Sequence, residues 1–194
     1  MRTELMTPRL EQAMSWAARC HAGQTRRSSG TPYFEHLAAV ALILDRSGFD
    51  EEVVIAGLLH DIIEDTPATW QHVAMRFGAD VAEIVRHCSE VKTDAHGKKR
   101  SWIDRKRDHI AALVDAPLTA RGVTLADKLH NLICIELDLH EGRPVWSEFH
   151  AGREQVLWYY HAVIDACGHD DPRLAQLAAG CHDVLARVEA LEKR

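Results

Sequence analysis

The sequence predicts an all-α fold in a single domain, and three observations lead to that prediction. Apolar residues recur along most of the chain at the three- to four-residue spacing of a helix face. Alternating runs rich in Val, Ile and Tyr with hairpin turns do not occur. The 194 residues also contain no internal repeat, low-complexity tract or linker. We therefore expect one domain over residues 1–194, built as a bundle of about eight to ten helices.

Five helices are expected in the first half of the chain, at residues 9–21, 33–46, 51–65, 69–77 and 79–88. The stretch HAGQTRRSSGTPY between the first two is rich in Gly, Ser and Pro, which excludes regular structure. The third helix contains VVIAGLLHDII, which is apolar on nearly all sides, so we expect it to run through the core. Thr69 is a candidate N-cap for the fourth helix, and Gly78 ends it.

Four more helices are expected in the second half, at residues 104–115, 119–140, 147–167 and 172–193. They follow EVKTDAHGKKRSWIDRKR, a polar loop that leads into a basic helix start. In the segment VTLADKLHNL, the side chains of Leu125, Leu129 and Leu132 form the stripe that we expect to be buried. For the basic runs Lys98–Arg100 and Arg105–Arg107, a solvated surface is favoured over a phosphate clamp.

Composition limits the classes of function. Acidic residues outnumber basic ones, 29 to 23, for a formal charge of −6, whereas a general nucleic-acid-binding surface usually needs a basic excess. No apolar run approaches the roughly 20 residues that cross a bilayer, and the first residues lack the apolar core of a secretory signal. We therefore expect a cytoplasmic protein that binds neither nucleic acid nor a membrane. The five scattered cysteines are expected to be reduced thiols.

The segment LLHDIIEDTP is the most informative part of the sequence. It places four ionisable residues, His60, Asp61, Glu64 and Asp65, at the end of the most apolar helix. Burying such groups without partners is costly, so they need a compensating charge. A divalent cation is the simplest one, and a mixture of imidazole and carboxylate suits Mn, Fe, Co or Zn.

One helix cannot surround an ion, so further ligands must come from other segments. His36 opens the second helix directly after TPYFE, and Asp127 lies in VTLADKLHNL. On that helix Asp127, His130 and Asn131 are three and four residues apart, so they share a face. Taken alone, this trio is more often a solvated helix face and His36 an ordinary helix-start residue. Beside a charged cluster, His36 and Asp127 become candidate ligands.

Four stretches of the sequence, taken in order, resemble a known family: HAGQTRRSSGTPYFEH, GLLHDIIEDT, RFGADVAEIV and VTLADKLHNL. They are similar to the HD hydrolase domain of RelA/SpoT homologues, in particular to the free-standing small alarmone hydrolases. The stretches span residues 21–132, in the family's order and at similar spacing. A lone His-Asp dipeptide would be weak support, whereas the whole set is specific. The resemblance implies an HD-type helical bundle.

The resemblance also implies a role for each matching residue. The implied metal ligands, usually of Mn²⁺ although other transition metals suit them, are His36, His60, Asp61 and Asp127, and we expect them to converge. Glu64 and Asp65 match an acidic pair that orients or deprotonates the attacking water. Arg26 and Arg27 match a basic pair that contacts the nucleotide base and phosphates. Asn131 matches a substrate-site asparagine.

The family removes pyrophosphate from the 3′ position of (p)ppGpp, and some members act on the adenosine analogues (pp)pApp. The resemblance therefore implies a metal-dependent 3′-pyrophosphohydrolase acting on a small nucleotide, which releases pyrophosphate and a 5′-phosphorylated nucleoside. Two alternatives stay open: a general HD nucleotidase with another substrate, and a non-catalytic nucleotide-binding module. The sequence chooses neither the base nor the metal, and it leaves the oligomeric state open.

Overall fold

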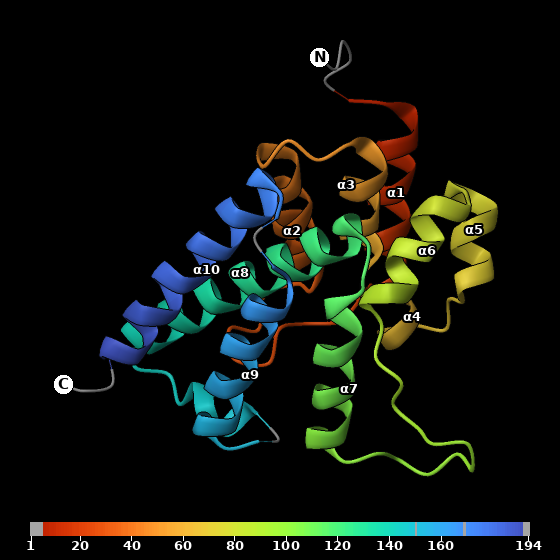
Figure 1. Ribbon diagram of the computed structural model, residues 1–194. Helices are drawn as coiled ribbons and strands as arrows, with labels where there is room; N and C mark the ends of the chain where they lie inside the picture. Colours follow the sequence, from red (N-terminus) through yellow and green to blue (C-terminus); the bar gives the residue numbers. More distant parts are fainter. Residues whose placement is uncertain (1–5, 150, 169, 192–194) are drawn as a thin grey trace.

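The computed structural model describes residues 6–149, 151–168 and 170–191. Within these ranges the chain forms ten α-helices, one 3-10 helix and no strand, which confirms the all-α prediction (Figure 1). In chain order the elements are α1 (Pro8–Cys20), α2 (Phe34–Arg46), α3 (Glu51–Leu59), α4 (Ile62–Asp65), α5 (Trp70–Phe77), α6 (Ala79–Cys88), α7 (Trp102–Val114), α8 (Leu118–His140), the 3-10 helix η1 (Val145–Glu148), α9 (Arg153–Ala166) and α10 (Pro172–Leu191).

Local caps explain where several helices begin and end. The hydroxyl of Thr7 accepts a hydrogen bond from the amide of Leu10 at 3.1 Å at the start of α1. The hydroxyl of Thr69 accepts the amide of His72 at 3.4 Å, so the predicted cap of α5 is confirmed. Gly78 has a φ of 91°, a conformation that favours glycine, and it separates α5 from α6.

The prediction of one helix over residues 51–65 is wrong. Helix α3 ends at Leu59, the chain turns at His60 and Asp61, and the short α4 follows. At this turn, Nδ1 of His60 donates a hydrogen bond to the carbonyl of Gly57 at 2.8 Å. A side chain thus binds a carbonyl that a continuous helix would use for its own backbone bonds. This bond holds the His60 imidazole at the C-terminal end of α3.

Two later helix starts also differ from the predicted ones, and the end of the last helix is not tested. Helix α7 begins at Trp102, two residues early, because the hydroxyl of Ser101 accepts the amide of Asp104 at 3.2 Å. The predicted helix 147–167 starts only at Arg153, because the 3-10 turn η1 precedes it; residue 150 lies outside the described residues. Helix α10 reaches Leu191, and the predicted residues 192–193 lie outside the described part.

Helix α3 lies in the middle of the core, as expected. Every side chain from Val53 to Leu59 is buried, and α2, α6, α1 and α8 pack around the helix (Figure 1). Gly57 permits a close approach of α2, because a Cβ at this position would lie 2.5 Å from Cδ1 of Leu44. This packing brings the start of α2, the end of α3 and the middle of α8 together.

Two further observations concern the class of protein. All five cysteines are free thiols, which confirms that prediction. In the described ranges, no helix combines the length and the apolar character that crossing a membrane requires.

Candidate metal centre

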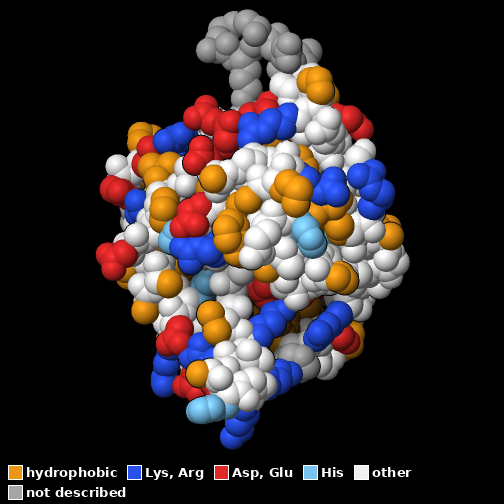
Figure 2. Space-filling model, turned by 90° about the vertical axis from the view of Figure 1, so that its right-hand side faces the viewer, with side chains coloured by type: hydrophobic (Ala, Val, Ile, Leu, Met, Phe, Trp, Pro, Cys, Tyr) orange, Lys and Arg blue, Asp and Glu red, His pale blue; other side chains and the backbone are white. Residues whose placement is uncertain are grey.

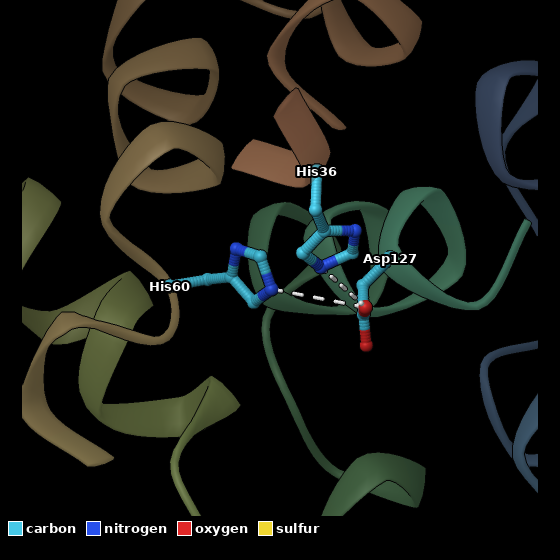
Figure 3. Close-up of side chains that lie close together, drawn as sticks. All are labelled: His36, His60 and Asp127. Carbon is cyan, nitrogen blue, oxygen red and sulfur yellow. Dashed lines mark ion pairs between the residues drawn. The ribbon is translucent and has the colours of Figure 1, made fainter. Parts of the chain in front are cut away.

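Three side chains from three separate segments of the chain converge on one point (Figure 3). Nε2 of His36, at the start of α2, lies 3.2 Å from Oδ1 of Asp127 in α8. Nε2 of His60, after α3, lies 3.7 Å from the same oxygen. One candidate ligand atom from each residue falls within 4.8 Å of the others. This spacing allows a single ion to contact all three.

Asp61 joins this cluster as a fourth candidate ligand. Its Oδ2 lies 3.0 Å from Nε2 of His60 and 3.7 Å from Nε2 of His36. The same oxygen accepts a hydrogen bond from the hydroxyl of Tyr33 at 2.6 Å. The four residues expected as ligands therefore lie together, while their role as ligands stays a prediction.

Hydrogen bonds orient both imidazole rings. Because Nδ1 of His60 donates to the Gly57 carbonyl, Nε2 is the nitrogen that faces the carboxylates. Nδ1 of His36 lies 2.8 Å from Nδ1 of His130, so His36 also turns Nε2 toward Asp127. Metal-bound histidines typically have their second nitrogen held in this way. Nε2 of His60 is buried without a well-aligned hydrogen-bond partner in the described chain, which fits an electron-pair acceptor at this position.

The electrostatics of the cluster also favour a cation. Burial by itself would raise the pKa of Asp127, but the Lys128 ammonium and the two imidazoles bring it well below the usual value. In Asp61, His60 likewise outweighs burial and lowers the pKa. Burial lowers the pKa of His60, yet these carboxylates raise it well above normal. Two ionised carboxylates therefore draw positive charge to this point, and a divalent ion could replace the proton on His60.

The two acidic residues proposed to act on water are tied to the loop after α6. Oε1 of Glu64 accepts the amide of Glu90 at 2.7 Å, and Oε2 lies 3.0 Å from Nζ of Lys92. The same ammonium lies 3.2 Å from Oδ1 of Asp65. Burial raises the pKa of Glu64 despite these contacts. Glu64 lines the cavity described below, whereas Asp65 does not.

The predicted basic pair is divided by the structure. Nη2 of Arg26 donates to Oδ1 of Asn131 at 2.8 Å, and Nδ2 of Asn131 donates to Oδ1 of Asp127 at 2.5 Å. Arg26 is thus linked, through the side chain of Asn131, to the group of four candidate ligands, which we call the metal cluster. Arg27 is exposed and instead donates to the carbonyl of Glu148 at 3.3 Å.

A cavity of about 190 Å³ adjoins the cluster and is lined by several residues that the sequence did not single out. Tyr33, His109 and Lys128 are among them. The sequence could have indicated two of them, because Lys128 directly follows Asp127 and Tyr33 lies in the TPYFEH stretch. No sequence pattern marked His109 as a cavity residue. Lys106 also lines the cavity, which makes the solvated-surface interpretation wrong for this residue. On one face of the molecule, Lys and Arg side chains gather around a hollow (Figure 2).

Comparison with known proteins shows what this chain is similar to. A family model for the HD domain matches residues 13–156. The bifunctional (p)ppGpp synthase/hydrolase SpoT of Escherichia coli is 44% identical over 125 residues, which are 64% of this chain. This chain spans only 18% of the length of that relative.

Two further relatives match over most of their length. The human guanosine-3′,5′-bis(diphosphate) 3′-pyrophosphohydrolase MESH1 is 36% identical over 157 residues, which cover 79% of this chain and 82% of the human one. The solved structure of a metazoan orthologue of SpoT, described as hydrolysing ppGpp, superposes with a TM-score of 0.80 at 26% identity, over 95% of this chain and 98% of that one. The protein therefore belongs to the HD domain family and is homologous to MESH1 and to the hydrolase region of SpoT.

Proposed function

We propose that this protein is a metal-dependent hydrolase that removes the 3′-pyrophosphate of alarmone nucleotides, (p)ppGpp or their adenosine analogues, in the stringent response. The observation that carries the proposal is the convergence of His36, His60, Asp61 and Asp127 beside a cavity that Glu64 also lines. Human MESH1 is named as a guanosine-3′,5′-bis(diphosphate) 3′-pyrophosphohydrolase, and the metazoan SpoT orthologue is described as hydrolysing ppGpp, which supports this class of substrate. The products are pyrophosphate and a 5′-phosphorylated nucleoside.

The donor set fits one divalent ion, and we propose Mn²⁺. Two imidazoles and two carboxylates are ligands that Mn²⁺ accepts, as do other transition metals. When bound, such an ion lowers the pKa of water and neutralises phosphoryl oxygens. His36, His60, Asp61 and Asp127 would hold it.

The other residues have distinct proposed roles. Glu64 is a general base, since burial raises its pKa and so makes the carboxylate a better proton acceptor. Asp65 contacts the same Lys92 ammonium as Glu64 and so holds it in place. Asn131 is hydrogen-bonded to Asp127 and Arg26 to Asn131, and both would contact the nucleotide. The guanidinium of Arg26 can bind a phosphate oxygen through charge-assisted hydrogen bonds.

The proposal is tested with a panel of nucleotides and the manganese-loaded protein. We expect the 3′-pyrophosphorylated guanosine or adenosine nucleotides to release pyrophosphate, whereas ATP, GTP and dGTP remain poor substrates. Hydrolysis of the plain triphosphates alone would instead identify a general nucleotidase. If no nucleotide is hydrolysed although several bind, the protein is a non-catalytic binding module.

The two arginines should contribute unequally to substrate binding. Arg26→Met removes a guanidinium that touches Asn131, so we expect KM to rise about tenfold or more through loss of a charge-assisted contact. Arg27→Met serves as the matched control and should change KM less than about threefold, because its guanidinium binds a backbone carbonyl at the surface. Steady-state kinetics measures both values. An equal rise in KM for the two variants would contradict this division.

Tyr33 should position Asp61 for metal binding. Tyr33→Phe removes the 2.6 Å hydrogen bond to Oδ2 of Asp61, and loss of such an outer partner typically weakens a metal site about 10- to 100-fold. Calorimetric titration with Mn²⁺ measures the effect. Tyr160→Phe is the control, because it removes a tyrosine hydroxyl from a residue that does not line the cavity. Unchanged affinity in Tyr33→Phe would show that Asp61 needs no such support.

A further inference from the structure

Basic and aromatic side chains that are not proposed metal ligands gather at one part of the cavity wall. Lys106 and His109 from α7, Lys128 from α8 and Tyr159 from α9 line this part, which we call the lysine end. Nζ of Lys106 lies 4.4 Å from the centre of the Tyr159 ring, and Nζ of Lys128 lies 5.5 Å from it. Two ammonium groups thus meet over one ring at the cavity wall.

The two lysines at this end share their carboxylate partners with other cations. Glu90 is bound by both Lys106 and Arg105, the latter at 3.0 Å. Lys128 has its contact at 2.6 Å with Oδ2 of Asp127, which is a proposed metal ligand. The other lining carboxylates belong to the metal cluster or to Glu64, which Lys92 binds. Lys106 and Arg105 thus share the single carboxylate of Glu90, and the carboxylate beside Lys128 is itself a proposed metal ligand. An anion in the cavity would therefore lower the cost of burying Lys106 and Lys128.

An unsatisfied hydroxyl points to the same conclusion. Tyr159 is 5% exposed and lines the cavity, and its hydroxyl has no hydrogen-bond partner among the described residues. Buried hydroxyls in proteins almost always have a partner, so an isolated one at a cavity wall indicates a ligand. An anionic oxygen would accept this hydrogen bond while it pairs with the neighbouring ammonium groups.

We propose that the lysine end binds the distal phosphate of a diphosphate group whose proximal phosphate lies at the metal cluster. This inference rests on the proposed function and adds the site that distinguishes a 3′-pyrophosphate from a 3′-monophosphate. Lys128 connects the two positions, because it touches both Asp127 and the ring of Tyr159. The cavity of about 190 Å³ is smaller than the roughly 300–1,000 Å³ of pockets for drug-sized ligands. It suits a diphosphate, with the nucleoside outside it.

The test compares the binding of inorganic pyrophosphate with that of orthophosphate, by calorimetry on the manganese-loaded full chain after excess ion is removed. Lys106→Met keeps the aliphatic stem and removes the charge, so pyrophosphate affinity should fall about 10- to 100-fold. Tyr159→Phe removes only the unpartnered hydroxyl, leaves the ring in place, and should cost about three- to tenfold. Orthophosphate and Mn²⁺ affinities should change less than about twofold in both variants.

Lys98→Met is the matched control, since Lys98 is an exposed lysine in the loop before α7 and should bind pyrophosphate as the unmodified protein does. The proposal is overturned if Lys106→Met and Tyr159→Phe both retain normal pyrophosphate affinity, or if the Lys98 variant loses as much. The result is separable from the proposed function. If the protein binds pyrophosphate through these residues but hydrolyses no 3′-pyrophosphorylated nucleotide, the phosphate site stands and the proposed activity is disproved. If it hydrolyses these nucleotides but both variants bind pyrophosphate normally, the activity stands and the phosphate site is disproved.

Discussion

Asp61→Ala is expected to abolish both manganese binding and turnover. Oδ2 of Asp61 lies against the Nε2 atoms of both imidazoles, at 3.0 and 3.7 Å, so its removal opens one side of the proposed coordination shell. Loss of a mere outer partner of a metal ligand typically costs about 10- to 100-fold in affinity. Loss of a ligand itself should therefore exceed about 100-fold. Calorimetric titration with Mn²⁺ and the rate of pyrophosphate release measure the two effects.

Asp94→Ala provides the control for this experiment. Asp94 is an exposed acid in the loop before α7, so its loss changes the net charge equally without touching the cluster. It should keep manganese affinity and turnover. Manganese binding of normal affinity in Asp61→Ala would exclude Asp61 from the ligand set, even if activity fell.

Glu64→Gln is expected to leave the metal affinity unchanged and to slow only the chemical step. The side-chain carbonyl of the glutamine can still accept the hydrogen bond from the Glu90 backbone, which is 2.7 Å long in the native protein, so the side chain should stay in place. It can no longer take a proton, and general bases typically contribute about 10²–10⁴ to the rate. We therefore expect a fall of that size in kcat with little change in KM.

A variant of the neighbouring Asp65 shows whether a slower Glu64→Gln has lost a general base or only a negative charge. Asp65→Asn removes the second carboxylate that contacts Lys92, at 3.2 Å, but Asp65 does not line the cavity. It should lower kcat by less than Glu64→Gln does. Single-turnover kinetics with saturating Mn²⁺ isolates the chemical step in both variants. A normal rate in Glu64→Gln would assign the proton to another group.

The periodicity of apolar residues predicted most of the fold, because helices are specified by local spacing and caps. Helices α2, α5 and α6 lie within one residue of their expected positions. The errors occur where side chains compete with the backbone or with neighbouring turns. At His60 an imidazole binds the Gly57 carbonyl, which interrupts the predicted helix. Before α9, the 3-10 turn η1 replaces the predicted first helical turns.

The sequence by itself determined which residue types gather around the metal cluster. The short motifs that contain His36, His60, Asp61 and Asp127 carry groups that are costly to bury unpaired, so the sequence predicted that these residues come together. The same reasoning placed Asn131 one helical turn after Asp127, and these two side chains do share a hydrogen bond.

Only the tertiary structure decided what surrounds that cluster. It separated Arg26, which touches Asn131, from its neighbour Arg27, which does not. It also moved Lys106 from an expected solvated run to the wall of the cavity. A charged side chain has no periodic signal of its own, so its environment depends on which helices pack beside it. Here α7, α8 and α9 meet through contacts between residues distant in sequence, and this packing brings both Lys106 and Lys128 to the ring of Tyr159.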